Sequence, residues 1–180
     1  DLPGLHLVNA VAPTPPLTHD SAWAALRAVP DPEIPVISVT ELGIVRGVRL
    51  VDHGAVEVTV TPTYAGCPAT ELIDAEIVAA LERAGASQVT VRRQLAPAWT
   101  TDWIDPDARE RLRAYGIVPP GEHVTGPQPI RLQPRAADTL PCPRCGSIDT
   151  ERLSQFGATA CKALYRCRAC REPFEYFKPL

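Results

Sequence analysis

Hydrophobic and polar positions change their spacing several times between residues 18 and 117. Helical spacing bounded by capping or helix-stopping residues predicts helices from Thr18 or Asp20 to Val29, over Ala69–Ala84 and over Asp105–Tyr115. Alternation of apolar and polar residues predicts strands over Ile44–Val51, Ala55–Thr61 and Val89–Leu95. This order of elements predicts an α+β fold, a small three-stranded α/β sandwich with its helices on one face of the sheet.

Proline-rich stretches mark the ends of this domain. Residues 1–17 are typical of a poorly ordered tail. Residues 118–140 are typical of a semi-rigid linker, with one short strand candidate at Ile130–Leu132. We therefore predict an α+β domain over residues 18–117 and a second, smaller domain over residues 141–180.

The second domain is defined by its cysteines. Cys142 and Cys145 form one CxxC pair, and Cys167 and Cys170 form another. Two such pairs can close a tetrahedral shell of four thiolates, which suits a structural zinc ion in a zinc-ribbon β domain; a rubredoxin-type iron site and two disulfides are the alternatives. A segment of about 40 residues buries too little apolar surface to fold alone, so we expect loss of zinc to unfold this end and leave the remainder folded.

Several other residues of this half have more than one interpretation. Cys161 is a fifth thiolate, a reactive thiol beside the zinc or a plain buried strand residue, and the last is favoured because four ligands already satisfy zinc. For Trp99 and Trp103, core packing is favoured over an interface. Five aromatic residues of the ribbon fit either its own small core or an anchor for a partner protein, and they are Phe156, Tyr165, Phe174, Tyr176 and Phe177.

Charge and cysteine use limit the setting. The 180-residue chain has a formal net charge of −3, which argues against broad nucleic-acid binding. Basic residues of the ribbon are interspersed with Glu151, Glu172 and Glu175, so they form no clean basic stripe. The sequence shows no secretory signal and no long apolar run, and four of its six cysteines fit a metal pattern. We therefore expect a reducing, cytoplasmic setting and no membrane partner.

Chemistry in the first domain is expected in two loops. Asp31 and Glu33 are held between prolines that restrict the backbone. Thr63 and Cys67 lie in the loop from the second strand to the second helix, and Pro68 is expected at the first helical position. The N-terminus of that helix would favour a thiolate at Cys67. Each motif alone is weak, because such residues more often form turns, caps or core.

Together these loops resemble a known family. The stretch DPEIPV from Asp31 to Val36, the run Leu42–Val45 and the TPTxxxCP loop from Thr61 to Pro68 are similar to motifs of the SufT/PaaD-like family of iron–sulfur and metal-cluster assembly proteins. The match covers residues from about 20 to 100. In that family the aspartate, glutamate, threonine and cysteine of these motifs surround one shallow pocket. The resemblance implies that a metal- or cluster-delivery site is formed here by Asp31, Glu33, Thr63 and Cys67.

The second half resembles the PaaD branch of that family, in the segments Trp99–Ile104 and Tyr115–Pro120, the two CxxC pairs and the run Phe156–Cys167. That branch is encoded with the multicomponent phenylacetyl-CoA epoxidase of aerobic phenylacetate degradation. The resemblance implies an accessory subunit, not catalytic alone, that matures its partners by delivering transient iron or an Fe–S cluster. The implied partners are the oxygenase or reductase subunits of that system, and a homodimer is a further option.

Other classes of function stay open. The chain can be a structural or docking subunit of the epoxidase without metal transfer. An enzyme acting through the Cys67 thiolate is a weaker alternative, because no histidine is placed as its base. The sequence contains neither the Glu-x-x-His ligands of a di-iron bundle nor the glycine-rich turn of a flavin or nicotinamide site, so we do not expect it to be the oxygenase or the reductase.

Overall fold

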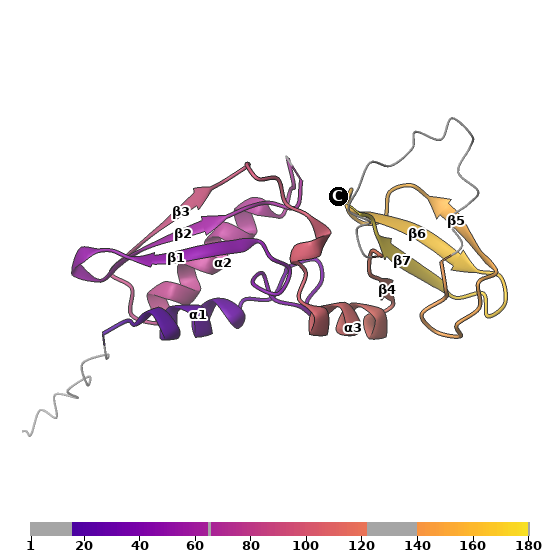
Figure 1. The fold of residues 1–180 in the computed structure, drawn as a ribbon, viewed down its shortest axis with the longest axis horizontal. Helices are drawn as coiled ribbons and strands as arrows, with labels where there is room; N and C mark the ends of the chain where they lie inside the picture. Colours follow the sequence, from indigo (N-terminus) through magenta and orange to yellow (C-terminus); the bar gives the residue numbers. More distant parts are fainter. Residues whose placement is uncertain (1–15, 65, 122–139, 180) are drawn as a thin grey trace, which may run out of the picture.

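The structure is a computed structural model that describes residues 16–64, 66–121 and 140–179. The strand candidate Ile130–Leu132 and most of the predicted tail lie outside the described residues. Two sheets lie side by side, and α3 and β4 lead from one to the other (Figure 1). None of the helices in the described ranges combines the length and the apolar character that crossing a bilayer requires.

The first sheet has the strand order β1-β2-β3. Its strands are β1, Val45–Leu50, β2, Ala55–Val60, and β3, Gln88–Arg93. The hairpin β1–β2 is antiparallel, whereas β2 and β3 are parallel because a helix crosses between them. Helices α1, His19–Arg27, and α2, Thr70–Arg83, pack on this sheet, α1 beside β1 and α2 beside β3. All these bounds lie within two residues of the predicted ones.

The main core lies between this sheet and its helices. Val56, Val58 and Val60 alternate with partly exposed residues along β2 and are at most 1% exposed. They belong to the same apolar cluster as Leu26 of α1 and Ile77 of α2, which are fully buried. The alternation that predicts the strand thus also selects its buried face. The predicted α+β class is confirmed.

The second sheet belongs to the cysteine-rich end and has the order β4-β7-β6-β5. Its strands are β4, Ile117–Val118, β5, Thr150–Ser154, β6, Lys162–Cys167, and β7, Pro173–Phe177. Helix α3, Pro106–Tyr115, ends at Gly116 and leads directly into β4. Val118 pairs with Tyr176 in a parallel ladder. Val118, which was expected at the start of the linker, is therefore part of the second sheet.

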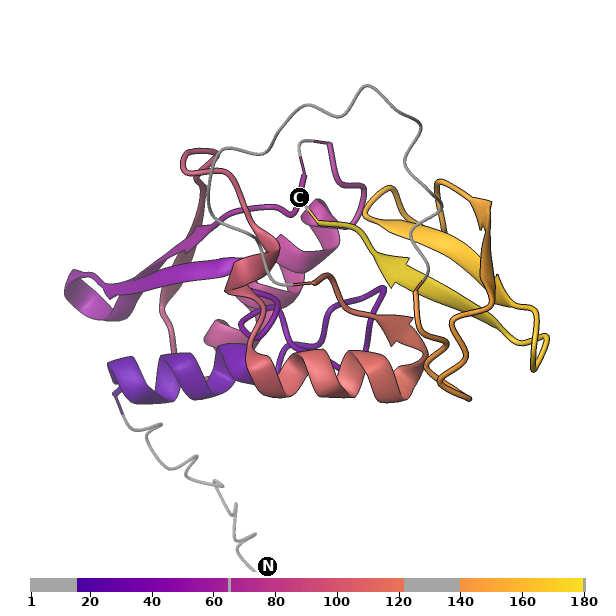
Figure 2. The same ribbon diagram turned by 45° about the vertical axis from the view of Figure 1, so that its right-hand side comes forward.

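The two parts share one core. Phe177, at the end of β7, is fully buried in the same apolar cluster as Val58. Its ring centroid lies 5.8 Å from that of Trp99, whose Nε1 donates a hydrogen bond of 3.0 Å to the carbonyl of Leu42. Figure 2 shows the C-terminal strand reaching back to the first part. Trp99 is a core residue, as favoured, and Trp103 is partly buried against the same cluster.

Candidate functional site

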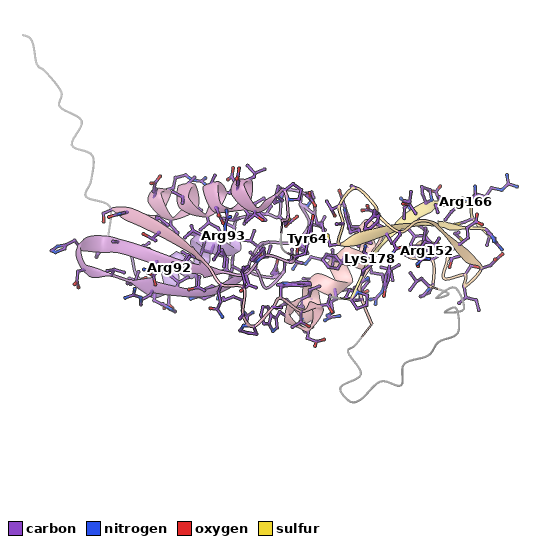
Figure 3. The ribbon with its side chains drawn as sticks, turned by 90° about the horizontal axis from the view of Figure 1, so that it is seen from above. Tyr64, Arg92, Arg93, Arg152, Arg166 and Lys178 are labelled. Atoms are coloured by element: carbon purple, nitrogen blue, oxygen red, sulfur yellow. The ribbon has the colours of Figure 1, made fainter. Side chains whose placement is uncertain are left out.

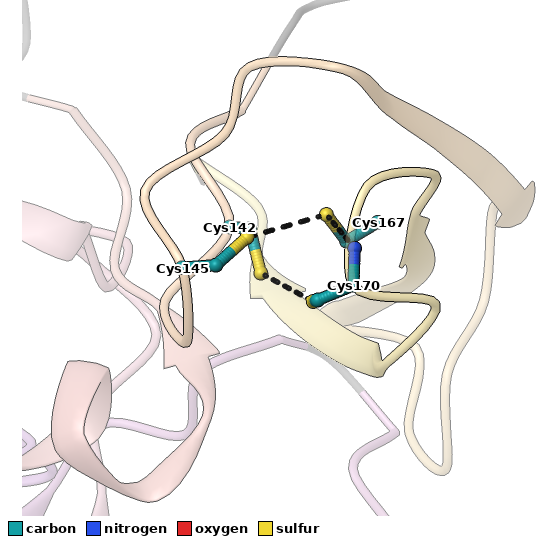
Figure 4. Close-up of side chains that lie close together, drawn as sticks. All are labelled: Cys142, Cys145, Cys167 and Cys170. Atoms are coloured by element: carbon teal, nitrogen blue, oxygen red, sulfur yellow. Dashed lines mark hydrogen bonds between the residues drawn. The ribbon is translucent and has the colours of Figure 1, made fainter.

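The four ribbon cysteines form a compact group (Figure 4). Cys142 Sγ lies 3.7 Å from Cys170 Sγ, and Cys145 Sγ lies 3.6 Å from Cys167 Sγ. All four sulfurs lie within 4.8 Å of one another. Sulfur ligands at about 2.3 Å from a tetrahedral zinc ion lie about 3.8 Å apart, so the group fits such an ion. The six cysteines are free thiols, which excludes the disulfide alternative in this structure.

Tight turns aim these thiols inward. In the first knuckle the amide of Gly146 donates to the carbonyl of Cys142 at 2.9 Å, and Gly146 has a φ of 74°, which suits glycine. In the second, the amide of Cys170 donates to Cys167 Sγ at 3.5 Å. This amide is the main reason that the pKa of Cys167 falls to about 7. The knuckle thus stabilises a thiolate, which is the form that binds metal.

The neighbouring thiols oppose complete deprotonation. The amide of Glu172 lowers the pKa of Cys170, but desolvation and the three other cysteines outweigh it and raise that pKa to about 12. Four adjacent thiolates repel one another unless a cation neutralises them. The donor set therefore requires a metal ion to become fully ionised, as a structural metal site does.

A second location gathers the candidate residues of the first domain. Asp31, Glu33, Thr63 and Cys67 all line one pocket at the junction between the two parts. The cavity volume is about 20 Å³, enough for about one water-sized occupant. Its remaining walls are mostly apolar, and they include Phe177 from β7. The structure thus brings together the four residues that the resemblance implied.

Asp31 organises the first loop of this pocket. Its Oδ1 accepts hydrogen bonds from the amides of Glu33, at 2.9 Å, and Ile34, at 2.8 Å. Desolvation raises the pKa of Asp31, and these two amides only partly offset the rise. The pKa of Glu33 is also raised, first by desolvation and then by the charge of Asp31. Both carboxyl groups therefore hold their protons more strongly than exposed ones do.

Cys67 lies in the loop before α2. The N-cap of this helix is Ala69 and its first residue is Thr70, so Pro68 precedes the helix and the prediction of Pro68 as its first residue is wrong. The carbonyl of Cys67 accepts hydrogen bonds from the amide of Thr70, at 3.2 Å, and from its hydroxyl, at 2.8 Å. These bonds fix the loop and leave the partly exposed thiol on the pocket wall.

The ribbon contributes residues that sequence reasoning did not place here. Cys161 is 6% exposed and lines the same pocket, immediately before β6 rather than inside a strand. The hydroxyl of Thr159 lies 3.0 Å from its sulfur. Lys162 is 3% exposed, and its Nζ lies 2.7 Å from Glu175 Oε2. Cys161, the ribbon cysteine outside the two CxxC pairs, was an indication of this arrangement in the sequence. A single sequence could not show, however, that the ribbon folds back onto the first domain.

The candidate donor atoms of the pocket are more widely spaced than those of the ribbon site. Within the described parts of the chain, the four ribbon cysteines are the group of three or more metal-ligating side chains whose donor atoms lie within 4.8 Å of one another. No three donors among Asp31, Glu33, Cys67 and Cys161 meet that spacing. The pocket as it stands is not a closed metal cage.

Comparison with known proteins identifies the family. A family model described as "Iron-sulfur cluster assembly protein" matches residues 19–92, and one described as "PaaD zinc beta ribbon domain" matches residues 126–178. A protein of Escherichia coli, named as a putative subunit of 1,2-phenylacetyl-CoA epoxidase, is 53% identical over 164 residues, which are 91% of this chain and 94% of that protein. The chain belongs to the PaaD family. The resemblance that its motifs indicated is therefore confirmed.

Other similar proteins match about half of the chain. A "Fe-S protein maturation auxiliary factor" of Porphyromonas gingivalis is 34% identical over 96 residues, which are 53% of this chain and 90% of that protein. Two solved structures are also similar: a domain of unknown function from Bacillus anthracis (25% identity, TM-score 0.49, 52% of this chain and 90% of that chain) and a conserved hypothetical protein from Thermotoga maritima (29% identity, TM-score 0.47, 53% of this chain and 94% of that chain).

The two family models cover different candidate residues of this PaaD-family chain. The assembly-protein model contains Asp31, Glu33, Thr63 and Cys67, whereas the PaaD ribbon model contains the four metal-binding cysteines and Cys161. The ribbon is thus a zinc-ribbon domain of the PaaD type. The ribbon also supplies Cys161 and Phe177 to the wall of the pocket in the first domain.

Proposed function

We propose that this chain is an accessory subunit of a phenylacetyl-CoA epoxidase system and that it delivers iron, or an iron–sulfur cluster, to a metal-containing partner of that system. The names of its two curated relatives, an epoxidase component and an Fe–S maturation factor, support this proposal. The observation that carries it is the convergence of Asp31, Glu33, Thr63 and Cys67, from two separate loops, on one small pocket.

The chemistry of the pocket suits transient binding. Cys67 and Glu33 are both partly exposed, and they offer a soft sulfur and a hard oxygen, two donor types that bind iron. The ribbon site, by contrast, closes four sulfurs around its metal. A looser set of donors releases its ion to a partner that offers more ligands, and that release is what delivery requires.

Protons take part in this exchange. An entering cation must displace any proton that the raised pKa values keep on Asp31 and Glu33. Metal affinity therefore falls as the pH falls toward those raised pKa values, because the protonated carboxyl no longer binds the cation. Protonation of Glu33, the more exposed of the two, offers a route for release.

A structural or docking subunit without metal transfer is the second candidate. Two observations favour it. Asp31 Oδ1 already accepts two backbone hydrogen bonds, and Thr63 is 9% exposed, so both residues also serve the fold. Under this alternative the pocket is a by-product of the junction between the two parts, and the ribbon holds the epoxidase subunits together.

Replacing Cys67 by alanine separates these candidates. We expect Cys67→Ala to leave the epoxidase subunits soluble but short of iron or cluster, to the level seen when this chain is absent. The measurement is the metal content of subunits purified from cells that make the wild-type chain, the variant or no copy. Ser87→Ala is the control, because the hydroxyl of Ser87 donates a hydrogen bond to the carbonyl of His53 at the hairpin end of the sheet. Full metallation in every background, with turnover lost only without the chain, would assign the docking role instead.

A further inference from the structure

Cys161 has no function in the ribbon site. The four sulfurs of that site form a complete tetrahedral group without it. Cys161 lies in the ribbon by sequence, yet it packs in the apolar cluster of the first domain, with its carbonyl accepting a hydrogen bond of 2.9 Å from the amide of Lys178. It is a free thiol on the wall of the junction pocket. The position of this buried thiol on the pocket wall therefore suggests a function in the pocket rather than in the ribbon site.

The two free thiols face one small space. Cys67 and Cys161 both line the pocket. Tyr64 lies where the two parts of the chain meet (Figure 3). The pKa of Tyr64 is raised by desolvation first, and then by Cys67, Cys161 and Glu33. The pKa of Cys161 responds in turn to Glu33 and Cys67. These groups therefore lie close enough to influence one another's charge.

Polar groups surround the thiol of Cys161. Desolvation raises the pKa of this thiol, and a hydrogen bond with Thr159 and the charge of Lys162 only partly offset the rise. The hydroxyl of Thr159, 3.0 Å from the sulfur, can donate to an ionised Cys161. Lys162 is held within the junction by its 2.7 Å ion pair with Glu175. The thiol therefore keeps its proton until an entering cation displaces it.

We propose that Cys161 is a second sulfur ligand of the junction pocket, so that a single thiophilic metal ion is bound between Cys67 of the first domain and Cys161 of the ribbon. This inference rests on the proposed delivery function and deepens it. The ion enters as a divalent cation, the two thiols each lose a proton to solvent, and no electron is transferred. A cavity of about 20 Å³ has room for one such ion.

This arrangement has two consequences. Two thiolates favour iron(II), cobalt(II) or zinc over magnesium or calcium, which prefer oxygen ligands. Because one ligand comes from each part of the chain, the ion binds only while the ribbon is docked. The structural metal of the ribbon then maintains the transient site as well as its own domain.

Cobalt(II) provides the test, because thiolate ligands give it an intense charge-transfer absorption. The full chain is prepared with its ribbon filled by zinc, which cobalt(II) displaces poorly because zinc binds such sites more tightly. We expect one further cobalt(II) per chain. Cys161→Ser and Cys67→Ser should each lower the charge-transfer intensity per cobalt to about one half and weaken binding about tenfold or more, as loss of one of two sulfur ligands implies. Ile34→Val is the matched control, since Ile34 lines the same pocket without a donor atom.

The opposite result is equally definite. Full charge-transfer intensity and unchanged affinity in Cys161→Ser, with one zinc retained per chain, would overturn the proposal. If that variant fails to fold, X-ray absorption of cobalt in the wild-type chain decides, because two sulfur neighbours support the proposal and one rejects it. A failure of the delivery function gives a different result. The partner subunits would then be fully metallated in cells that make Cys67→Ala, whereas cobalt bound to the wild-type chain would still have two sulfur ligands.

Discussion

Removing the metal from the four ribbon cysteines is expected to unfold the second sheet and to weaken the first domain as well. Structural zinc contributes about 10–16 kcal/mol in small zinc-binding peptides, far more than the small core around Tyr165 and Phe174 supplies. The sequence alone predicts that the remainder stays intact. The structure changes that expectation, because Phe177 belongs to the core of the first domain. We therefore expect the first domain to remain folded but to melt at a lower temperature.

This expectation is checked with Cys142→Ser and Cys145→Ser, each in the full chain. Amide hydrogen exchange should show loss of protection over β5 to β7, with protection retained but reduced in β1 to β3. Cys67→Ala is the matched control, because Cys67 lies outside the ribbon site and the variant should keep its metal. Unchanged protection of β5 to β7 in a metal-free chain would contradict the structural role given to the metal.

Phe177→Ala is expected to destabilise the whole chain by about 3–5 kcal/mol, the usual cost of truncating a fully buried phenylalanine. Phe177 is 0% exposed and packs against Trp99. The substitution removes the side chain that joins the ribbon to the first domain, so it should also loosen the pocket that Phe177 lines. The free energy of unfolding is measured in urea with the ribbon metal in place.

Phe156→Ala is the matched control for that measurement. Phe156 belongs to the same ribbon but is 61% exposed, with Lys178 Nζ 4.5 Å from the centre of its ring. Its loss should cost about 0.5 kcal/mol or less, as for other surface substitutions. Equal, small effects of the two substitutions would show that the ribbon does not share its core with the first domain.

The elements of the first domain were predictable because local pattern decides them. Alternating valines select β2 and its buried face, and Gly116 ends α3 as its helix-stopping position indicates. The ribbon metal site was predictable for a similar reason, since two CxxC pairs carry both the ligands and the tight turns. Each of these features is determined by residues that lie close together in the sequence.

The junction was not predictable, because it depends on contacts between residues far apart in the chain. Phe177 and Tyr165 are both aromatic residues of ribbon strands, yet Phe177 packs in the first domain and Tyr165 packs in the ribbon. Cys161 was correctly expected to be buried, but not against the first domain. Val118 joins the second sheet through a two-residue strand, too short to show a period.

The candidate site divides in the same way. Asp31, Glu33, Thr63 and Cys67 were named through the motifs of the family, and the structure shows them on one pocket. These motifs lie in two separate loops, and no periodicity in the sequence indicates that the two loops meet in space. Cys161 and Lys162 complete the surroundings of that pocket from the ribbon, so their role required the tertiary structure.

Direct transfer of iron tests the central claim most sharply. The purified chain is loaded with labelled iron(II) and mixed with a metal-free epoxidase component and a chelator that captures any free iron. We predict that labelled iron reaches the epoxidase component even with the chelator present, and that it does not do so from a preparation of Cys67→Ala treated in the same way. Iron that passes only to the chelator, with the component acquiring metal no faster than from free iron, would contradict delivery by this chain.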